Sequence, residues 1–64
     1  MSFAENIKNA RLSAGMTQQQ LADKLGLDRT EITKYERGIS NPKLTNIQKI
    51  CDALNISVDE LLKD

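Results

Sequence analysis

The stretch QQQLADKLGLDRTEITKYER, from Gln18 to Arg37, decides the fold of this chain. Its apolar residues recur at helical spacing on both sides of a glycine, which predicts two short helices that cross at a sharp turn. Gly26 can take the left-handed conformation that ends the first helix, and Ala22 is small enough for Ile32 of the second helix to pack against it. A second helix held out from the domain in this way fits the major groove of duplex DNA.

Apolar residues at helical spacing continue on both sides of this stretch, and nothing alternates with the two-residue period of a strand. We therefore expect an all-α domain of five helices, at about residues 3–14, 18–25, 29–37, 44–55 and 58–63. The second and third helices would form a helix-turn-helix. The side chains expected to face the core are Phe3, Ile7, Ala10, Ala14, Leu21, Ala22, Leu25, Ile32, Tyr35, Leu44, Ile47, Ile50, Cys51 and Leu54.

Polar residues at the expected helix starts have the spacing of capping groups. Ser2, Thr17 and Ser57 are each followed three residues later by Glu or Gln, which is the pattern of a capping box. Asp28 is a suitable N-cap for the third helix, and Glu31 stands where a capping-box acid would fold back.

Length and composition exclude several classes of protein. Sixty-four residues are enough for one domain, residues 1–64, and no apolar run approaches the ~20 residues that a membrane span needs. The amino terminus has no signal-peptide pattern. With Cys51 as the only cysteine and no histidine, the chain can build neither a disulfide framework nor a usual zinc site, so we expect no metal, no cofactor and a reducing cytoplasm. No catalytic residue is expected either, because acid–base pairs and phosphate-binding loops are lacking.

The formal net charge is zero, which counts against nucleic-acid binding, but the charges are unevenly placed. Residues 11–43 carry six basic and four acidic groups, whereas residues 44–64 carry two basic and four acidic groups. A chain with this distribution can present a basic face to phosphate and turn its acidic end away.

The chain resembles the lambdoid phage repressor and Cro helix-turn-helix family, often called the XRE family, over essentially its whole length. The resemblance implies a compact five-helix, lambda-repressor-like DNA-binding domain. The residues that carry it are Arg11, Thr17-Gln18, Leu21-Ala22, Gly26, Ile32, Glu36-x-Gly38, Pro42, Leu54 and Ser57-Val58-Asp59-Glu60-Leu61-Leu62.

The resemblance also implies roles for individual residues. The positions that match base contacts are Arg29, Thr30, Thr33 and Lys34. Gln18 and Arg11 match phosphate contacts, and Lys43 matches a position near the DNA backbone or the minor groove. We also expect phosphate contacts from Lys43, Arg37 and Thr17. Gln18 would also pack against the start of the reading helix, and Arg11 and Glu36 would form a partly buried salt bridge. One residue departs from the family pattern, since Glu31 is acidic where members often have a small polar residue.

Several of these positions also have a simpler interpretation. Arg29 would be a solvated arginine in the first turn of a helix if it did not reach a guanine. Thr30 and Thr33 can touch a thymine methyl, bond a phosphate or face water. Arg37 and Lys43 could equally be solvated surface groups.

Together these features predict sequence-specific binding of double-stranded DNA by a bacterial or phage transcriptional regulator, most simply a repressor. A single reading helix covers few base pairs, so we expect a homodimer on a roughly palindromic operator, with Val58, Leu62 and Ile39 as candidate contact residues. The alternative, which the zero net charge motivates, is a protein-interaction module such as an antitoxin or the target domain of an anti-repressor.

Overall fold

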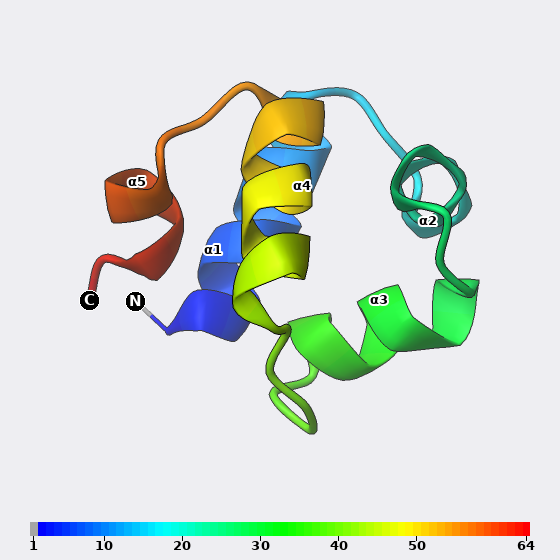
Figure 1. Cartoon of the computed structure of the whole chain (residues 1–64), viewed down its shortest axis with the longest axis horizontal. Coiled ribbons are helices and arrows are strands. Elements are labelled where there is room, and N and C mark those ends of the chain that lie inside the picture. Colours follow the sequence, from blue (N-terminus) through cyan, green and yellow to red (C-terminus); the bar gives the residue numbers. More distant parts are fainter. Residues whose placement is uncertain (1) are drawn as a thin grey trace.

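The structure, a computed structural model, describes residues 2–64 and contains five helices and no strand within them (Figure 1). The helices are α1 (Phe3–Ser13), α2 (Gln18–Leu25), α3 (Arg29–Glu36), α4 (Leu44–Leu54) and α5 (Val58–Leu62). The all-α prediction is confirmed, and the predicted helix boundaries differ from those of the structure by a single residue at the carboxyl ends of α1, α3, α4 and α5.

The helices enclose one core. Its buried side chains are Ile7, Leu21, Ala22, Leu25, Ile32, Tyr35, Ile50, Cys51, Leu54 and Leu61. Phe3 packs against this cluster, with its ring edge-on to Tyr35 at a centroid distance of 6.5 Å. Two predictions are wrong, because Ala14 is exposed at the C-cap of α1 and Leu44 is 68% exposed at the start of α4. Both residues continue the apolar stripe of their helix, but they lie at its end, outside the part of the helix that packs against the core.

The capping predictions have three outcomes. Ser2 and Thr17 form complete capping boxes, whereas for Ser57 the described residues show only its bond from the Glu60 N–H, at 3.1 Å. Asp28 occupies the N-cap of α3 but makes no side-chain capping bond, so the predicted cap with Glu31 is wrong. The Glu31 carboxylate lies instead 3.9 Å from the ammonium of Lys34, which offers it an opposite charge one turn further on.

The turn between α2 and α3 has the predicted form. Gly26 has φ +70°, in the left-handed region, and the following Leu27 N–H donates to the Ala22 carbonyl at 2.9 Å. Ala22 and Ile32 are fully buried in the core that both helices share. The positions of α2 and α3 are therefore fixed by the tight backbone turn at Gly26 and by the core that the two helices share.

The arrangement of the helices leaves α3 on the outside of the molecule (Figure 1). α2 and α5 lie at opposite ends of the long axis, and α3 runs along the lower edge of the view from α2 to the base of α4. α3 packs against α1 and α2, and α5 packs against α1 and α4. The loop of residues 37–43 leaves the end of α3 and projects beyond it before α4 begins.

Candidate nucleic-acid interface

The four residues predicted to contact bases lie on one face of α3. They occupy positions one, two, five and six of the helix, which at 3.6 residues per turn fall within about 140° of its circumference. Arg29, Thr30 and Lys34 are exposed and Thr33 is half-buried, whereas Ile32 and Tyr35 face the core. The sequence-predicted set is therefore brought together on an outward surface.

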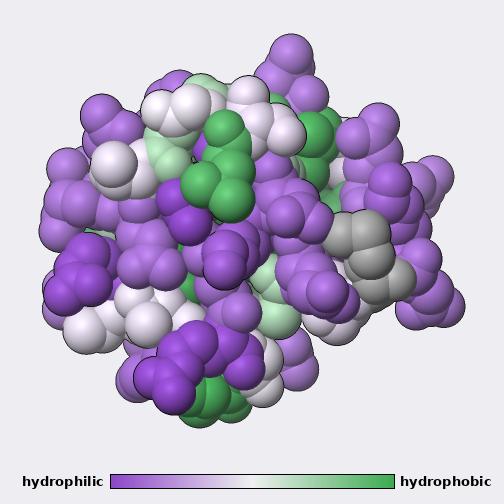
Figure 2. Space-filling view, turned by 180° about the vertical axis from the view of Figure 1, so that it is seen from behind, coloured by the Kyte–Doolittle hydropathy of each residue, from purple (hydrophilic) through white to green (hydrophobic). Residues whose placement is uncertain are grey.

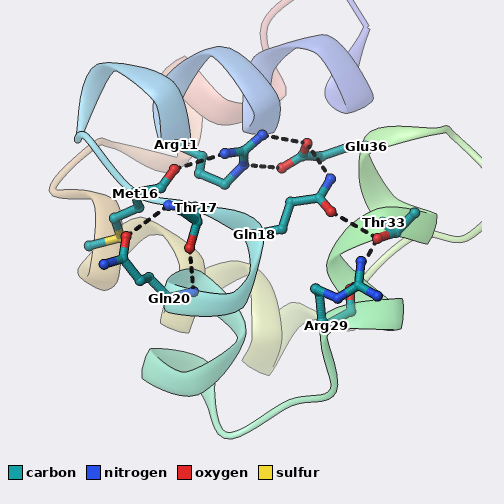
Figure 3. Close-up of polar contacts among 8 residues, drawn as sticks. All are labelled: Arg11, Met16, Thr17, Gln18, Gln20, Arg29, Thr33 and Glu36. Carbon is teal, nitrogen blue, oxygen red and sulfur yellow. Dashed lines mark hydrogen bonds and ion pairs between the residues drawn. The ribbon is translucent and has the colours of Figure 1, made fainter.

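α3 is fixed to α1 by an ion pair between Arg11 and Glu36. The Arg11 Nε lies 2.6 Å from Glu36 Oε2 and Nη2 lies 3.0 Å from Oε1, so the contact is bidentate (Figure 3). The two side chains are only 9% and 4% exposed. The predicted salt bridge is present, and it joins Arg11 in α1 to the last residue of α3.

Arg11 is committed to this structural contact. A third bond runs from its Nη1 to the Met16 carbonyl at 2.8 Å, in the segment that leads into α2. Of the five N–H groups of the guanidinium, two have no partner within residues 2–64, and the residue is 7% exposed. Only these two N–H groups are left for the predicted phosphate contact, and they belong to a side chain that is almost fully buried.

Gln18, the first residue of α2, is held between two residues of α3. Its Nε2 donates to Glu36 Oε1 at 3.1 Å, and its Oε1 accepts from the Thr33 hydroxyl at 3.0 Å (Figure 3). The prediction that Gln18 packs against the start of α3 is wrong, because the Glu36 carboxylate draws the amide to the end of that helix. One N–H of the amide stays unbonded within the protein and is available to a phosphate.

The amino end of α2 offers backbone donors beside this amide. The Thr17 hydroxyl accepts from the Gln20 N–H, and the first intrahelical bond joins the Leu21 N–H to the Thr17 carbonyl. The N–H groups of Gln18 and Gln19 precede that bond, so they remain free for an acceptor from outside. Together with the helix dipole, they form a suitable position for a phosphate.

The two remaining predicted phosphate ligands lie at the ends of the loop that follows α3. Arg37 is the C-cap of α3 and Lys43 is the N-cap of α4, and both are exposed. The structure therefore places one exposed cation at each end of residues 37–43, next to the reading helix.

The sequence did not reveal Asn6 as a structural residue. Its Nδ2 donates to the carbonyls of Leu61 and Lys63, at 2.9 Å and 2.7 Å, and so ties α5 to α1. Asn6 is 6% exposed. The sequence feature that could have indicated its burial is its position, since Asn6 stands in the same helical stripe as Phe3 and Ile7.

Apolar side chains remain exposed outside the core. They include the three candidate dimer residues Val58, Leu62 and Ile39, and also Leu12 and Leu44. The face seen in Figure 2 is largely hydrophilic, and its apolar groups are separated by polar side chains. An association through this face would therefore use small apolar contacts rather than one broad patch.

Other kinds of site find little support among the described residues. Cys51 is buried, and burial together with the neighbouring charge of Asp52 raises the pKa of its thiol, so the reactive thiolate is disfavoured. Residues 2–64 hold no group of three or more side chains suited to bind a metal. No helix in this part of the chain is long and apolar enough to span a bilayer.

Comparisons with known proteins agree with this geometry. Residues 7–61 match the helix-turn-helix family. The chain is 44% identical over 61 residues to the cryptic phage CTXphi transcriptional repressor RstR of Vibrio cholerae serotype O1, covering 95% of this chain and 54% of that protein. The chain thus spans about half the length of that relative.

Two solved structures extend the comparison. The restriction-modification controller protein C.AhdI from Aeromonas hydrophila is 38% identical, with a TM-score of 0.88 over 94% of this chain and 91% of its own. The P22 c2 repressor in complex with a synthetic operator is 28% identical, with a TM-score of 0.92 over 98% and 96% of the two chains. The chain belongs to the helix-turn-helix family, and within it to the repressor and Cro type that its sequence indicated.

Proposed function

We propose that residues 1–64 form the sequence-specific, double-stranded DNA-binding domain of a cytoplasmic transcriptional regulator that acts as a repressor. The observation that carries this proposal is the outward face of α3, where Arg29, Thr30 and Lys34 are exposed on a helix fixed by the Arg11–Glu36 pair. A rigid helix with exposed donors can enter the major groove without first having to be ordered.

Base contacts would come from α3. The guanidinium of Arg29 can donate to guanine O6 and N7 together, which is worth ~1–3 kcal/mol of discrimination for a good bidentate pair. Thr30 and Lys34 lie on the same face and would contact neighbouring bases or phosphates. The weak ion pair between Lys34 and Glu31, at 3.9 Å and exposed, leaves the ammonium free to move to DNA.

Phosphate contacts would come from two places beside α3. At the amino end of α2, the free N–H groups of Gln18 and Gln19 and the hydroxyl of Thr17 would hold one phosphate. At the loop after α3, Arg37 and Lys43 would neutralise others. Each cation that neutralises a phosphate should steepen the dependence of log K on log salt by ~0.9.

The regulator would bind as a homodimer. A single α3 covers only a few base pairs, so a roughly palindromic operator read by two copies would give useful specificity. Val58 and Leu62, exposed on α5, and Ile39, exposed in the loop after α3, are the apolar side chains that would form the contact. We assign no catalytic activity to the domain.

A protein-interaction module is the second candidate function. It is favoured by the zero net charge, which gives the chain no general attraction to DNA, and by the exposed apolar residues. In that case the domain would belong to an antitoxin and bind its toxin, or it would be the target of an anti-repressor. DNA contact would then be secondary.

Selection from a pool of random duplexes separates the two functions. We expect a preferred, roughly palindromic sequence to be enriched, and its affinity to fall steeply as salt is raised from about 50 to 200 mM. The exposed cation Lys49 on α4 lies outside residues 11–43, which carry the excess of basic groups. Lys49→Ala is therefore the control and should leave the affinity unchanged. No enriched sequence together with a flat salt response would favour the interaction module.

A further inference from the structure

The hydroxyl of Thr33 is surrounded by acceptors within the protein. It lies 3.0 Å from Gln18 Oε1 and 3.2 Å from the carbonyl oxygen of Arg29 (Figure 3). A hydroxyl has one proton to donate, and both of these neighbours can only accept it. The proton of Thr33 is therefore directed into the protein, whichever acceptor holds it.

The Glu36 carboxylate decides which end of the Gln18 amide faces Thr33. An ionised carboxylate can only accept hydrogen bonds, so the amide nitrogen of Gln18 must point toward Glu36, at 3.1 Å. The amide oxygen is then left to face Thr33. Arg11 holds the carboxylate in place through its bidentate contact, so the orientation of the amide is fixed before any ligand arrives.

From this chain of bonds we infer that Gln18 and Glu36 set the hydrogen-bonding character of Thr33, making it an acceptor toward the groove and a determinant of base specificity. The inference rests on the proposed DNA-binding function. Thr33 is half-buried and lies on the outward face of α3, so the lone pairs of its hydroxyl oxygen and its methyl group are what it can present to a base.

An acceptor in the major groove separates adenine and cytosine from guanine and thymine. Adenine and cytosine each offer an amino group there, whereas guanine offers only acceptors and thymine offers an acceptor and a methyl group. At the base that Thr33 meets, the protein should therefore prefer adenine or cytosine over guanine. Since a single neutral hydrogen bond is involved, the expected preference is roughly three- to tenfold. Gln18 and Glu36 act here as positioning residues, because they do not contact the base themselves and affect it only by orienting the Thr33 hydroxyl.

The test measures affinity for the selected operator and for duplexes changed at one base pair at a time. Thr33→Val keeps the shape and a methyl group but removes the acceptor, so it should lower the preference for adenine or cytosine at one base pair. Thr33→Ser keeps the hydroxyl and should retain that preference. Failure to obtain any operator from wild-type protein would count against the proposed function rather than against this inference.

Gln18→Met tests the positioning role. Methionine has similar length and good helix propensity but no amide, so the Thr33 proton would be held only by the longer bond to the Arg29 carbonyl. We expect the preference at the Thr33 base pair to fall by about two- to threefold, in addition to a loss of affinity shared by all sequences. Gln48→Met changes an exposed glutamine of α4 that has no proposed DNA contact, and it should leave the preference unaltered.

A combined variant makes the test sharper. In a Thr33→Val background the acceptor is gone, so adding Gln18→Met should not change the base preference any further. The inference is overturned if Thr33→Val alters no base preference, or if Gln18→Met leaves the preference at its wild-type value.

Discussion

Arg11 Nε lies 2.6 Å from a carboxylate oxygen of Glu36, and this contact joins the first helix of the fold to the last residue of α3. The same carboxylate accepts from Gln18, whose oxygen in turn accepts from Thr33. Elements far apart in the sequence are therefore connected through one carboxylate, next to the surface proposed to read DNA.

Replacing Arg11 with methionine should destabilise the domain strongly. The change leaves the Glu36 charge buried without its partner, for which the loss of stability is about 3–5 kcal/mol at near-complete burial. Urea denaturation followed by circular dichroism measures it. The control is Glu31→Gln, which removes the exposed pair with Lys34 and should change stability by less than about 1 kcal/mol. Equal effects of the two variants would contradict a bracing role for Arg11.

Replacing Gly26 with alanine should also destabilise the helix-turn-helix. The backbone at Gly26 has φ +70°, and an L residue there costs about 1–2 kcal/mol. Nothing lies within 4 Å of a Cβ added at this position, so the cost is conformational rather than steric. Gly26→Asn should cost less, because asparagine enters the left-handed region more readily. Thermal unfolding of the two variants would decide, and an alanine variant as stable as wild type would refute the explanation.

Replacing Asn6 with alanine should loosen α5. The carbonyls of Leu61 and Lys63 lose their donor. The bond to Leu61 is buried, and a buried acceptor left unpaired costs about 1–3 kcal/mol, whereas the bond to Lys63 is only partly buried. Amide hydrogen exchange in residues 58–63 should accelerate more than exchange in α2. Asn9→Ala, an exposed asparagine of the same helix, is the matched control and should leave these rates alone.

Cys51 should make stability depend on pH in the alkaline range. Burial, with a smaller effect from Asp52, raises the pKa of the thiol in the folded protein above its ordinary value of 9.0. As the pH rises past 9.0, the unfolded state loses this proton before the folded state does, so stability falls. Below that pH the contribution is constant. Denaturation between pH 7 and about 10.5 should show a steeper decline for wild type than for Cys51→Ala, in which the other groups that titrate are unchanged.

Local sequence patterns predicted the elements whose causes are local. The boxes at Ser2 and Thr17 depend on residues three positions apart, and the turn at Gly26 depends on a backbone conformation that glycine favours. Periodicity failed at Ala14 and Leu44, because the spacing of apolar residues gives the direction of a side chain and not the extent of the helix packed opposite.

Contacts between distant residues were less accessible. The Arg11–Glu36 pair was expected only from the family resemblance, since 25 residues separate the partners. The bonds of Asn6 to α5 span 55 residues or more and have no local signature. The position of the Gln18 amide depends on where Glu36 and Thr33 come to lie in three dimensions. The sequence predicted which residues share the outer face of α3, but not the hydrogen bonds behind that face.

The affinity of an Arg29→Ala, Lys34→Ala variant for the selected operator tests the central proposal most directly. Both side chains are exposed, so the melting temperature should stay within a few degrees of the wild-type value while specific binding weakens by about tenfold or more for each residue that contacts a base. Fluorescence anisotropy on the operator and on a scrambled duplex gives both affinities. A folded variant that still binds its operator as tightly as wild type would contradict the assignment of α3 as the reading helix.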